Sequence, residues 1–407
     1  MSPSSAFANR GCNPLHRHYT GALIQNKNFN SNRKIKLANG KKILAPPEKG
    51  ARPATSLVPS IRDVALAAGV STATVSRTLS SPEVVSEATR AAVFAAIEET
   101  GYRLNVAARN LRKRVTGAVA VLVPNLANPF FSRILSAIAE VMSAAGYNVL
   151  ITDTTPTALD DHRFPEFFSL NQTDGLIILD GMLPRDLLLH RGTPDFRAPM
   201  VFACEWIDEI DRPKVSIDNR DGALQAVAHL LALGHRRIGL VTGPPGNVLT
   251  ATRREGACAA IRAAGLELPD DWVYDGDFTL AAGTRAAAHW HAQTERPSAV
   301  FCASDEMAMG FIGELHRRGF SVPEDVSVVG FDDLEIAAHF VPALTTIHQP
   351  RAEIGRTAAQ MLLDRMRLSL RERTRTRPPE IILPVQLVTR ASTGAPNPAA
   401  AAAAPPG

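Results

Sequence analysis

Cysteine is scarce in this sequence of 407 residues, and its spacing excludes two kinds of site. Disulfide frameworks and zinc sites need closely spaced cysteines, and none of the four cysteines here has such a neighbour. His289 and His291 are two residues apart, which places them on different faces of a helix and argues against a zinc pair. We therefore expect reduced thiols and no metal site. The cysteines are Cys12, Cys204, Cys258 and Cys302.

Long apolar runs are also missing. No uninterrupted run approaches the roughly 18 apolar residues that span a bilayer. The residues after Met1 lack the apolar core of a secretory signal peptide. The sequence thus predicts a cytoplasmic protein without a membrane partner.

Common catalytic and phosphate-binding motifs are absent as well. The chain contains no G-x-S-x-G elbow, no P-loop lysine and no H-E-x-x-H pair. The segment Gly243-Pro-Pro-Gly246 has no lysine directly after it, and we expect it to form a loop. We therefore expect no enzymatic activity, no catalytic residue and no cofactor.

The net charge of +4 is distributed unevenly along the chain. Residues 1–60 contain ten basic side chains and a single acidic one, Glu48. Residues 61–114 contain eight basic and five acidic side chains, so the remainder of the chain is acidic. A basic front on an acidic body indicates a polyanionic partner for the front.

After residue 115 the sequence alternates between short apolar runs and amphipathic helical segments, which is typical of doubly wound parallel α/β sheets. The flanking residues 1–59 and 391–407 lack any sustained period, and we expect both to be disordered. The basic extension could bind phosphates, be a solvated tail without function, or reflect a start codon assigned too early. The expected strands are 118–123, 148–151, 175–179, 238–241, 299–302 and 326–329. The expected helices include 133–145, 223–233, 254–264, 280–292 and 307–318.

Residues 60–103 have the pattern of an all-α helix-turn-helix domain. Gly69 provides the turn between two short helices, and Ser71 caps the second. A third helix, 87–100, begins after Ser86 and ends at Gly101. The first two helices share a small apolar core that contains Val64, Ala65, Ala68, Val75 and Leu79.

The outward side of the second helix carries hydroxyl groups and an arginine, which suit the major groove of DNA. A helical hairpin with merely solvated polar residues is the alternative. We expect Thr72, Ala73 and Arg77 to read bases, and Thr74 and Ser76 to contact phosphates.

Residues 104–115 are expected to form a hinge that becomes helical only on DNA, because so short a helix is unstable alone. Leu111 lies among basic residues, an arrangement that suits insertion into the minor groove. A charged linker with one incidental leucine is the alternative. The candidate DNA contacts here are Asn105, Arg109 and Leu111.

The run Asp63-Val-Ala-Leu-Ala-Ala-Gly-Val-Ser-Thr-Ala-Thr-Val-Ser-Arg77 resembles the head motif of the LacI/GalR family of bacterial regulators. Further family-like segments follow in the family's order, so the resemblance covers residues 60–392 and leaves only the two tails outside. Leu104 stands where the family often has proline, which puts the entry into the hinge in doubt. The further segments are Gly101-Tyr102, Ala108–Leu111, Asn128–Phe131, Gly234–Ile238, Ser304–Gly310, Pro323–Asp332 and Leu344–Ile347.

For residues 116–390 the resemblance implies a two-lobed effector-binding and dimerisation domain, like periplasmic sugar-binding proteins, with three crossing strands. The first lobe would contain residues 116–230 and 346–378, and the second 231–345 and 379–390. The cleft between the lobes would face the carboxyl ends of the strands, where α/β sheets bind ligands.

Several polar and aromatic residues follow the expected strands and would line this cleft. Aromatic faces stack on ligand rings, while carboxylates and arginine bind hydroxyl groups. A helix cap or a surface ion pair is an alternative explanation for each of them. Arg253 and Asp332 match family positions that line the cleft. The candidate effector-binding residues are Asn128, Phe130, Glu205, Arg253, Phe278, Ser304, Asp305 and Asp332.

Together these features predict a sequence-specific transcriptional regulator, a repressor by resemblance, that binds double-stranded operator DNA as a homodimer. A small effector would control its DNA affinity by binding two states differently. The chain is most similar to the cytidine-responsive branch of the family, so a nucleoside is the first candidate effector, with a sugar or a purine as alternatives. A solute-binding protein of transport is a more distant alternative.

Overall fold

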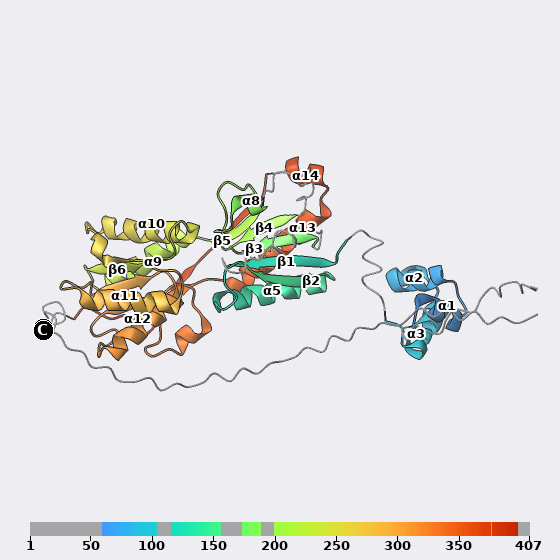
Figure 1. The fold of residues 1–407 in the computed structure, drawn as a ribbon, viewed down its shortest axis with the longest axis horizontal. Coiled ribbons are helices and arrows are strands. Elements are labelled where there is room, and N and C mark those ends of the chain that lie inside the picture. Colours follow the sequence, from blue (N-terminus) through green and yellow to red (C-terminus); the bar gives the residue numbers. More distant parts are fainter. Residues whose placement is uncertain (1–58, 104–114, 156–172, 189–198, 376, 398–407) are drawn as a thin grey trace, which may run out of the picture. The chain divides into compact units, whose positions relative to one another are not determined.

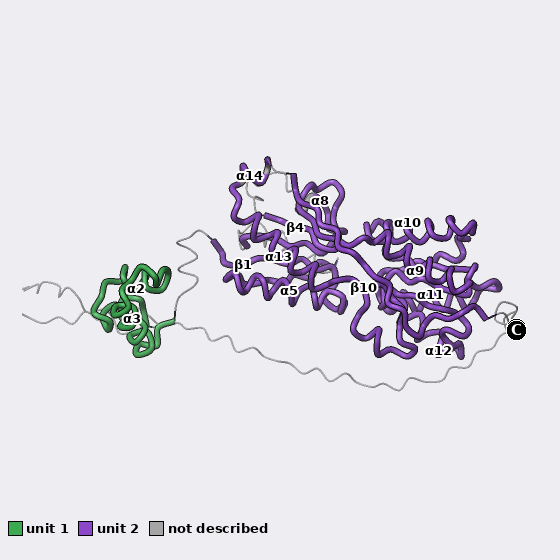
Figure 2. The backbone as a smooth tube through the Cα atoms, turned by 180° about the vertical axis from the view of Figure 1, so that it is seen from behind, with its two compact units in different colours: residues 1–103 green, residues 104–407 purple. Residues whose placement is uncertain are grey.

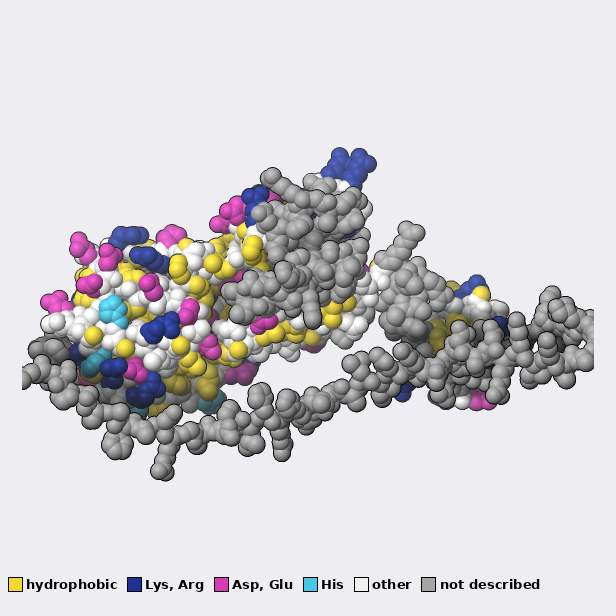
Figure 3. All heavy atoms as spheres, viewed as in Figure 1, with side chains coloured by type: hydrophobic (Ala, Val, Ile, Leu, Met, Phe, Trp, Pro, Cys, Tyr) yellow, Lys and Arg dark blue, Asp and Glu magenta, His cyan; other side chains and the backbone are white. Residues whose placement is uncertain are grey.

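The computed structural model describes residues 59–103, 115–155, 173–188, 199–375 and 377–397. The chain divides into two compact units, residues 1–103 and 104–407 (Figure 2). No helix in these ranges is both long and apolar enough to cross a membrane. On the face shown in Figure 3, basic and acidic side chains are interspersed over the second lobe of the larger unit, without an extended patch of one charge.

The head unit is helical in its described part, as predicted. Its elements are α1 (Ile61–Ala67), α2 (Thr72–Ser80), the 3-10 turn η1 (Pro82–Val84) and α3 (Glu87–Thr100). Gly69 turns the chain between α1 and α2 with a φ of +66°, a conformation that glycine adopts without strain. Val64, Val75 and Val93 bring one buried side chain from each helix into a common core.

The larger unit, which we call the two-lobed core, has two lobes. Its first lobe is built on a six-stranded sheet (Figure 1). Its elements are β1 (Ala118–Val123), α5 (Phe130–Ala144), β2 (Asn148–Asp153), β3 (Gly175–Ile178), α8 (Arg185–Leu188), β4 (Met200–Ala203), β5 (Lys214–Ile217), α13 (Arg351–Arg367), α14 (Leu370–Arg375) and β11 (Glu380–Leu383). The strands lie in the order β11, β5, β4, β3, β1, β2, and all pairs are parallel. β1 and β3 are buried throughout, as continuous apolar runs require. Helices α5 and α13 pack on each other and on this sheet.

The second lobe has a four-stranded parallel sheet in the order β7, β6, β8, β9. Its elements are α9 (Asn219–Ala232), β6 (Ile238–Val241), α10 (Val248–Ala263), η2 (Asp270–Trp272), β7 (Val273–Tyr274), α11 (Leu280–Ala292), β8 (Ala299–Cys302), α12 (Asp305–Arg317), β9 (Ser327–Val329) and η3 (Glu335–Ala338). Helix α10 packs on α9, and α11 packs on α12. Glycine permits both close approaches: a Cβ at Gly256 would lie 2.0 Å from the carbonyl oxygen of Arg220, and one at Gly283 would lie 2.0 Å from that of Met307.

The chain passes between the lobes three times: after β5, through β10 (Thr346–His348) and through β12 (Gln386–Val388), and β10 and β12 pair antiparallel. This corrects two of the expected lobe boundaries. Helix α9 was expected largely in the first lobe, but it packs on α10 of the second. Strand β11 was expected in the second lobe, but it pairs with β5 of the first. An amphipathic pattern shows that one face of an element is buried, but it does not show which sheet buries it.

The expectation of a disordered tail from residue 391 is wrong for residues 391–397. Ser392 is fully buried, and its Oγ donates a hydrogen bond of 2.6 Å to the carbonyl oxygen of Val328. The carbonyl oxygen of Gly394 lies 2.9 Å from Nε2 of His235, which is also buried. Residues 391–397 are small and pack beside the second sheet. The prediction failed because their composition is also that of a disordered tail.

We predict that residues 391–397 stabilise the second lobe. A chain that ends at Arg390 should lose roughly 2–4 kcal/mol of unfolding free energy, because several buried hydrogen bonds worth about 1 kcal/mol each disappear. Urea unfolding measures this, and the control is a chain that ends at Asn397. Equal stability of the two truncated chains would contradict the prediction.

Candidate functional site

Helix α2 presents the predicted DNA-reading side chains in the head unit. Ser71 caps the helix, with its Oγ accepting a hydrogen bond of 3.1 Å from the backbone N–H of Thr74. Thr72, Ala73 and Arg77 are exposed on the helix. Three of the five predicted α2 contacts are therefore fully available to a partner.

The other two predicted α2 contacts are half-buried. The hydroxyl of Thr74 lies 2.9 Å from that of Ser71, so part of its hydrogen-bonding capacity is used inside the cap. Ser76 is half-buried next to the core residue Val75. The predicted hinge contacts Asn105, Arg109 and Leu111 lie outside the described residues.

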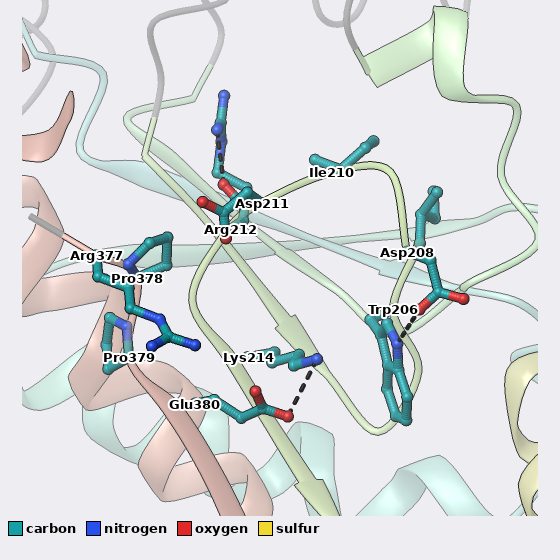
Figure 4. A pocket seen from close by; sticks show the side chains of 11 residues that line it. Trp206, Asp208, Ile210, Asp211, Arg212, Lys214, Arg377, Pro378, Pro379 and Glu380 are labelled. Carbon is teal, nitrogen blue, oxygen red and sulfur yellow. Dashed lines mark hydrogen bonds and ion pairs between the residues drawn. The ribbon is translucent and has the colours of Figure 1, made fainter.

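Cavities of about 540, 450 and 470 Å³ are found in the described part of the core. The first lies in the first lobe beside the start of β5 (Figure 4). Its polar groups pair with one another, for example Lys214 with Glu380 at 3.0 Å and Trp206 with Asp208 at 2.7 Å. These residues are exposed or half-buried, so this cavity has the character of a solvated surface depression.

The cavity of about 470 Å³ lies between the two lobes, and we call it the cleft. The first lobe contributes residues that follow β1 and β4, and the second lobe contributes residues from α10 and from the ends of β8 and β9. Phe130 and Phe131 form an edge-to-face pair with ring centroids 5.1 Å apart. Seven of the eight predicted effector-binding residues line it: Asn128, Phe130, Glu205, Arg253, Phe278, Ser304 and Asp332.

Glu205 connects the two lobes across the cleft. Its Oε2 accepts hydrogen bonds of 2.9 Å from the backbone N–H of Gly181 in the first lobe and from Nδ2 of Asn247 in the second. Glu205 is only 6% exposed, and this burial raises its pKa to about 7. A carboxyl group that is partly protonated at neutral pH can both donate and accept hydrogen bonds.

Arg253 is buried on the second-lobe side of the cleft. Its Nε donates to Oδ1 of Asn219 at 2.9 Å, and its Nη1 donates to the carbonyl oxygen of Ala303 at 2.6 Å. Asp332 Oδ1 lies 3.7 Å away, and the guanidinium group is 3.8 Å from the ring centroid of Phe331. The positive charge is therefore largely satisfied within the protein.

Asp305 lies behind the cleft and is not among its lining residues. Its side chain is fully buried, and both carboxylate oxygens accept hydrogen bonds, one from Thr346 Oγ1 and one from the backbone N–H of Leu334. These hydrogen bonds link α12 to the neighbouring turns, and a contact of Asp305 with the effector stays a prediction. Ser304 lines the cleft and also caps α12.

Six polar residues that line the cleft were not predicted: Asn125, Thr154, Thr155, Asp180, Asn247 and Asp277. Asp180 follows β3 and accepts a hydrogen bond of 2.5 Å from Thr154 Oγ1. Asn247 caps α10, whose expected start at residue 254 was six residues too late. Asp180 follows an apolar run of the sequence, just as Glu205 does. The reasoning that identified Glu205 as a cleft residue could therefore have identified Asp180 as well.

Backbone geometry also marks the cleft. Cys204, Phe278 and Asp332 are non-glycine residues with φ of +68°, +63° and +126°. Such conformations cost on the order of 1–3 kcal/mol and concentrate at functional sites. All three lie in or next to the cleft lining, and no pattern in the sequence indicates them.

Comparison with known proteins gives two family matches. Residues 60–105 match the model of bacterial regulatory proteins of the lacI family, and residues 227–393 match a periplasmic binding protein-like domain. The HTH-type transcriptional repressor CytR of Escherichia coli (strain K12) is 40% identical over 309 residues, which cover 75% of this chain and 89% of CytR.

Solved structures agree with this assignment. The transcriptional regulator CelR-cellobiose complex is 33% identical with a TM-score of 0.61, and the match covers 82% of this chain and 99% of that one. The lac repressor dimer bound to operator and the anti-inducer ONPF is 28% identical with a TM-score of 0.71, covering 83% of this chain and 100% of that one. The head and the two-lobed core thus occur together, in the same order, in proteins that regulate transcription, and the chain belongs to the lacI family of bacterial transcriptional regulators.

Proposed function

We propose that this regulator represses transcription as a homodimer on operator DNA and that a nucleoside bound in the cleft controls it. It acts as a binding protein rather than an enzyme, and it acts in the cytoplasm, where bacterial DNA is found. The dimer is supported by the similar lac repressor structure, which is a dimer bound to operator.

The head supports the DNA-binding part of this proposal through the exposed side chains of α2. Thr72, Ala73 and Arg77 can reach base edges. Thr74 and Ser76 contact phosphates through their hydroxyl groups, and that of Thr74 can do so in addition to its hydrogen bond with Ser71. The folded residues 61–103 contain four basic and five acidic side chains, so they attract DNA only weakly by charge. The hinge residues Asn105 and Arg109 add phosphate contacts, and Leu111 inserts into the minor groove.

One observation carries the effector class: the cleft combines aromatic rings with buried carboxyl groups, and the single cation among its described lining residues, Arg253, is paired within the protein. Its charged lining residues are Asp180, Glu205, Arg253, Asp277 and Asp332, and Arg253 is already bound within the protein. This lining disfavours a phosphorylated ligand and suits a neutral one with hydroxyl groups. Phe130, Phe131 and Phe278 provide faces for a planar ring. A nucleoside has both parts.

A sugar is the second candidate because the similar CelR structure contains cellobiose. A sugar would use the same carboxyl and amide groups for its hydroxyls. It would gain less from the aromatic rings, since it has no planar base to stack on them.

We predict that cytidine raises the melting temperature of the protein and that cytidine 5′-monophosphate does not, because ligands stabilise the state that they bind. Phe278→Leu should weaken cytidine binding about two- to twelvefold, since aromatic stacking contributes about 0.5–1.5 kcal/mol. Phe340→Leu is the matched control, because Phe340 is also half-buried in the second lobe but does not line the cleft. A shift with cellobiose alone, or equal losses in the two variants, would exclude the nucleoside assignment.

Arg77 should determine sequence preference rather than general DNA affinity. Arg77→Ala is expected to weaken binding to a duplex selected in vitro by about tenfold or more, because a good arginine–guanine contact contributes about 1–3 kcal/mol of discrimination. Binding to a scrambled duplex should change much less. Fluorescence anisotropy at fixed salt measures binding to the two duplexes. The control is Arg254→Ala, which removes an exposed arginine on α10 of the two-lobed unit. A uniform loss on both duplexes would assign Arg77 to phosphate contact instead.

The raised pKa of Glu205 predicts a pH-dependent stability. The folded pKa of about 7 lies above the usual glutamate value of 4.5, so ionisation costs more in the folded chain, and the unfolding free energy decreases as the pH rises between these values. Glu205→Gln should therefore be more stable than the wild type near pH 8, by on the order of 1–3 kcal/mol. The difference should vanish near pH 5. Urea unfolding across this range tests it, and the exposed variant Glu140→Gln should follow the wild type.

A further inference from the structure

A second cavity lies between the lobes, beside the end of the crossing strand β10 and the start of α13. Its volume is about 450 Å³, and we call it the hinge cavity. Asp332 lines the cleft and the next residue, Asp333, lines the hinge cavity. Gln349 also lines the hinge cavity and donates a hydrogen bond of 2.7 Å to Oδ1 of Asp332. The two cavities therefore share a wall.

Arg351 in this cavity is a buried cation that makes no direct ion pair with a described residue, although the carboxylates of Asp332, Asp305 and Glu335 lie near it. The residue is 6% exposed, and the structure records one hydrogen bond for its side chain, from Nη2 to the carbonyl oxygen of Asp333 at 3.0 Å. No carboxylate of a described residue forms an ion pair with it. Burial lowers the pKa of Arg351, the carboxylate of Asp332 raises it, and the nearby Arg133 lowers it again, because two cations face the same space. Asp332 also faces Arg253, with its Oδ1 3.7 Å from Nη1, so one carboxylate serves two arginines, and a further anion between Arg351 and Arg133 is favoured.

Other donors face the same cavity. Arg356 lines it, is exposed, and has no hydrogen-bond or ion-pair partner among the described residues. Helix α13 begins here without a side-chain cap, and the backbone N–H groups of Ala352 and Glu353 in its first turn have no acceptor in the described structure. Guanidinium groups at the start of a helix are a common arrangement for binding phosphate groups.

The carboxylates in the cavity wall are mostly neutralised. Asp333 accepts hydrogen bonds from Arg390 at 2.6 Å and from His348 at 2.8 Å. Glu335 on η3 accepts from Nε of Arg133 on α5 at 2.6 Å, which joins the two lobes. Glu353 is exposed. The cationic character of the hinge cavity thus contrasts with the acidic cleft on the other side of the wall.

We propose that the hinge cavity binds a phosphate group, held by Arg351, Arg356 and the first turn of α13. The group belongs either to free phosphate or to a small phosphorylated metabolite. A bound phosphate would compete with Glu335 for Arg133 and would contact both lobes next to the crossing strands. This site is separate from the effector site, and it takes the class of ligand that the cleft disfavours.

The test is isothermal titration calorimetry of the full chain with inorganic phosphate and with glycerol 3-phosphate, at constant ionic strength set by chloride. Arg356→Gln should weaken phosphate binding at least fivefold. Glu335→Gln should strengthen it, because it releases Arg133 from its ion pair. Arg254→Gln, which removes an exposed arginine on α10, should leave it unchanged. All three substitutions are at exposed positions, and melting temperatures verify that the variants are folded.

Tighter binding of glycerol 3-phosphate than of phosphate would indicate a phosphorylated metabolite, and equal binding would indicate free phosphate; both support the site. Absence of binding by both ligands would overturn the proposal. Equal losses in Arg356→Gln and Arg254→Gln would also overturn it, because they would show a general effect of surface charge.

Discussion

The buried guanidinium group of Arg253 is the interaction around which the cleft is organised. A charge at 3% exposure is costly unless it is paired, so its partners must stay where they are. Those partners come from three places in the second lobe: Asn219 at the start of α9, Ala303 after β8, and Asp332 after β9. One side chain thus fixes the ends of the elements that form this wall of the cleft. A ligand in the cleft would meet a preformed surface rather than create one.

The connection between the lobes is the second constraint on this protein. Three segments of the described chain cross, and β10 and β12 are paired with each other, so the lobes can move together or apart without breaking either sheet. The polar contacts that span the gap are few and have modest strength, such as Glu205 with Asn247 and Arg133 with Glu335. An effector can shift such an equilibrium only by binding one arrangement better than another. Carboxyl groups with raised pKa values in the cleft allow that preference to depend on pH.

Much of the fold could be predicted because local signals and tertiary packing agree. The helices 87–100 and 280–292 and the strands 118–123, 238–241 and 299–302 have the same bounds in the structure as in the prediction. Capping residues and uninterrupted apolar runs determine these bounds locally. The start of α10 was missed because Asn247 follows a Gly-Pro-rich loop and the first turns of its helix contain Val248, Thr250 and Thr252, which have weak helical preference.

The sequence by itself determined the order of the elements, the helix-turn-helix head, the family and most of the residues around the cleft, because periodicity, caps and motifs are properties of neighbouring residues. Tertiary structure alone decided which lobe receives α9 and β11, that residues 391–397 pack on the second lobe, and that Asp305 lies behind the cleft wall rather than in it. It also decided that Asp332 and Asp333 serve different cavities. These outcomes depend on contacts between residues far apart in the chain, and on positive φ angles that the surrounding packing imposes on single residues.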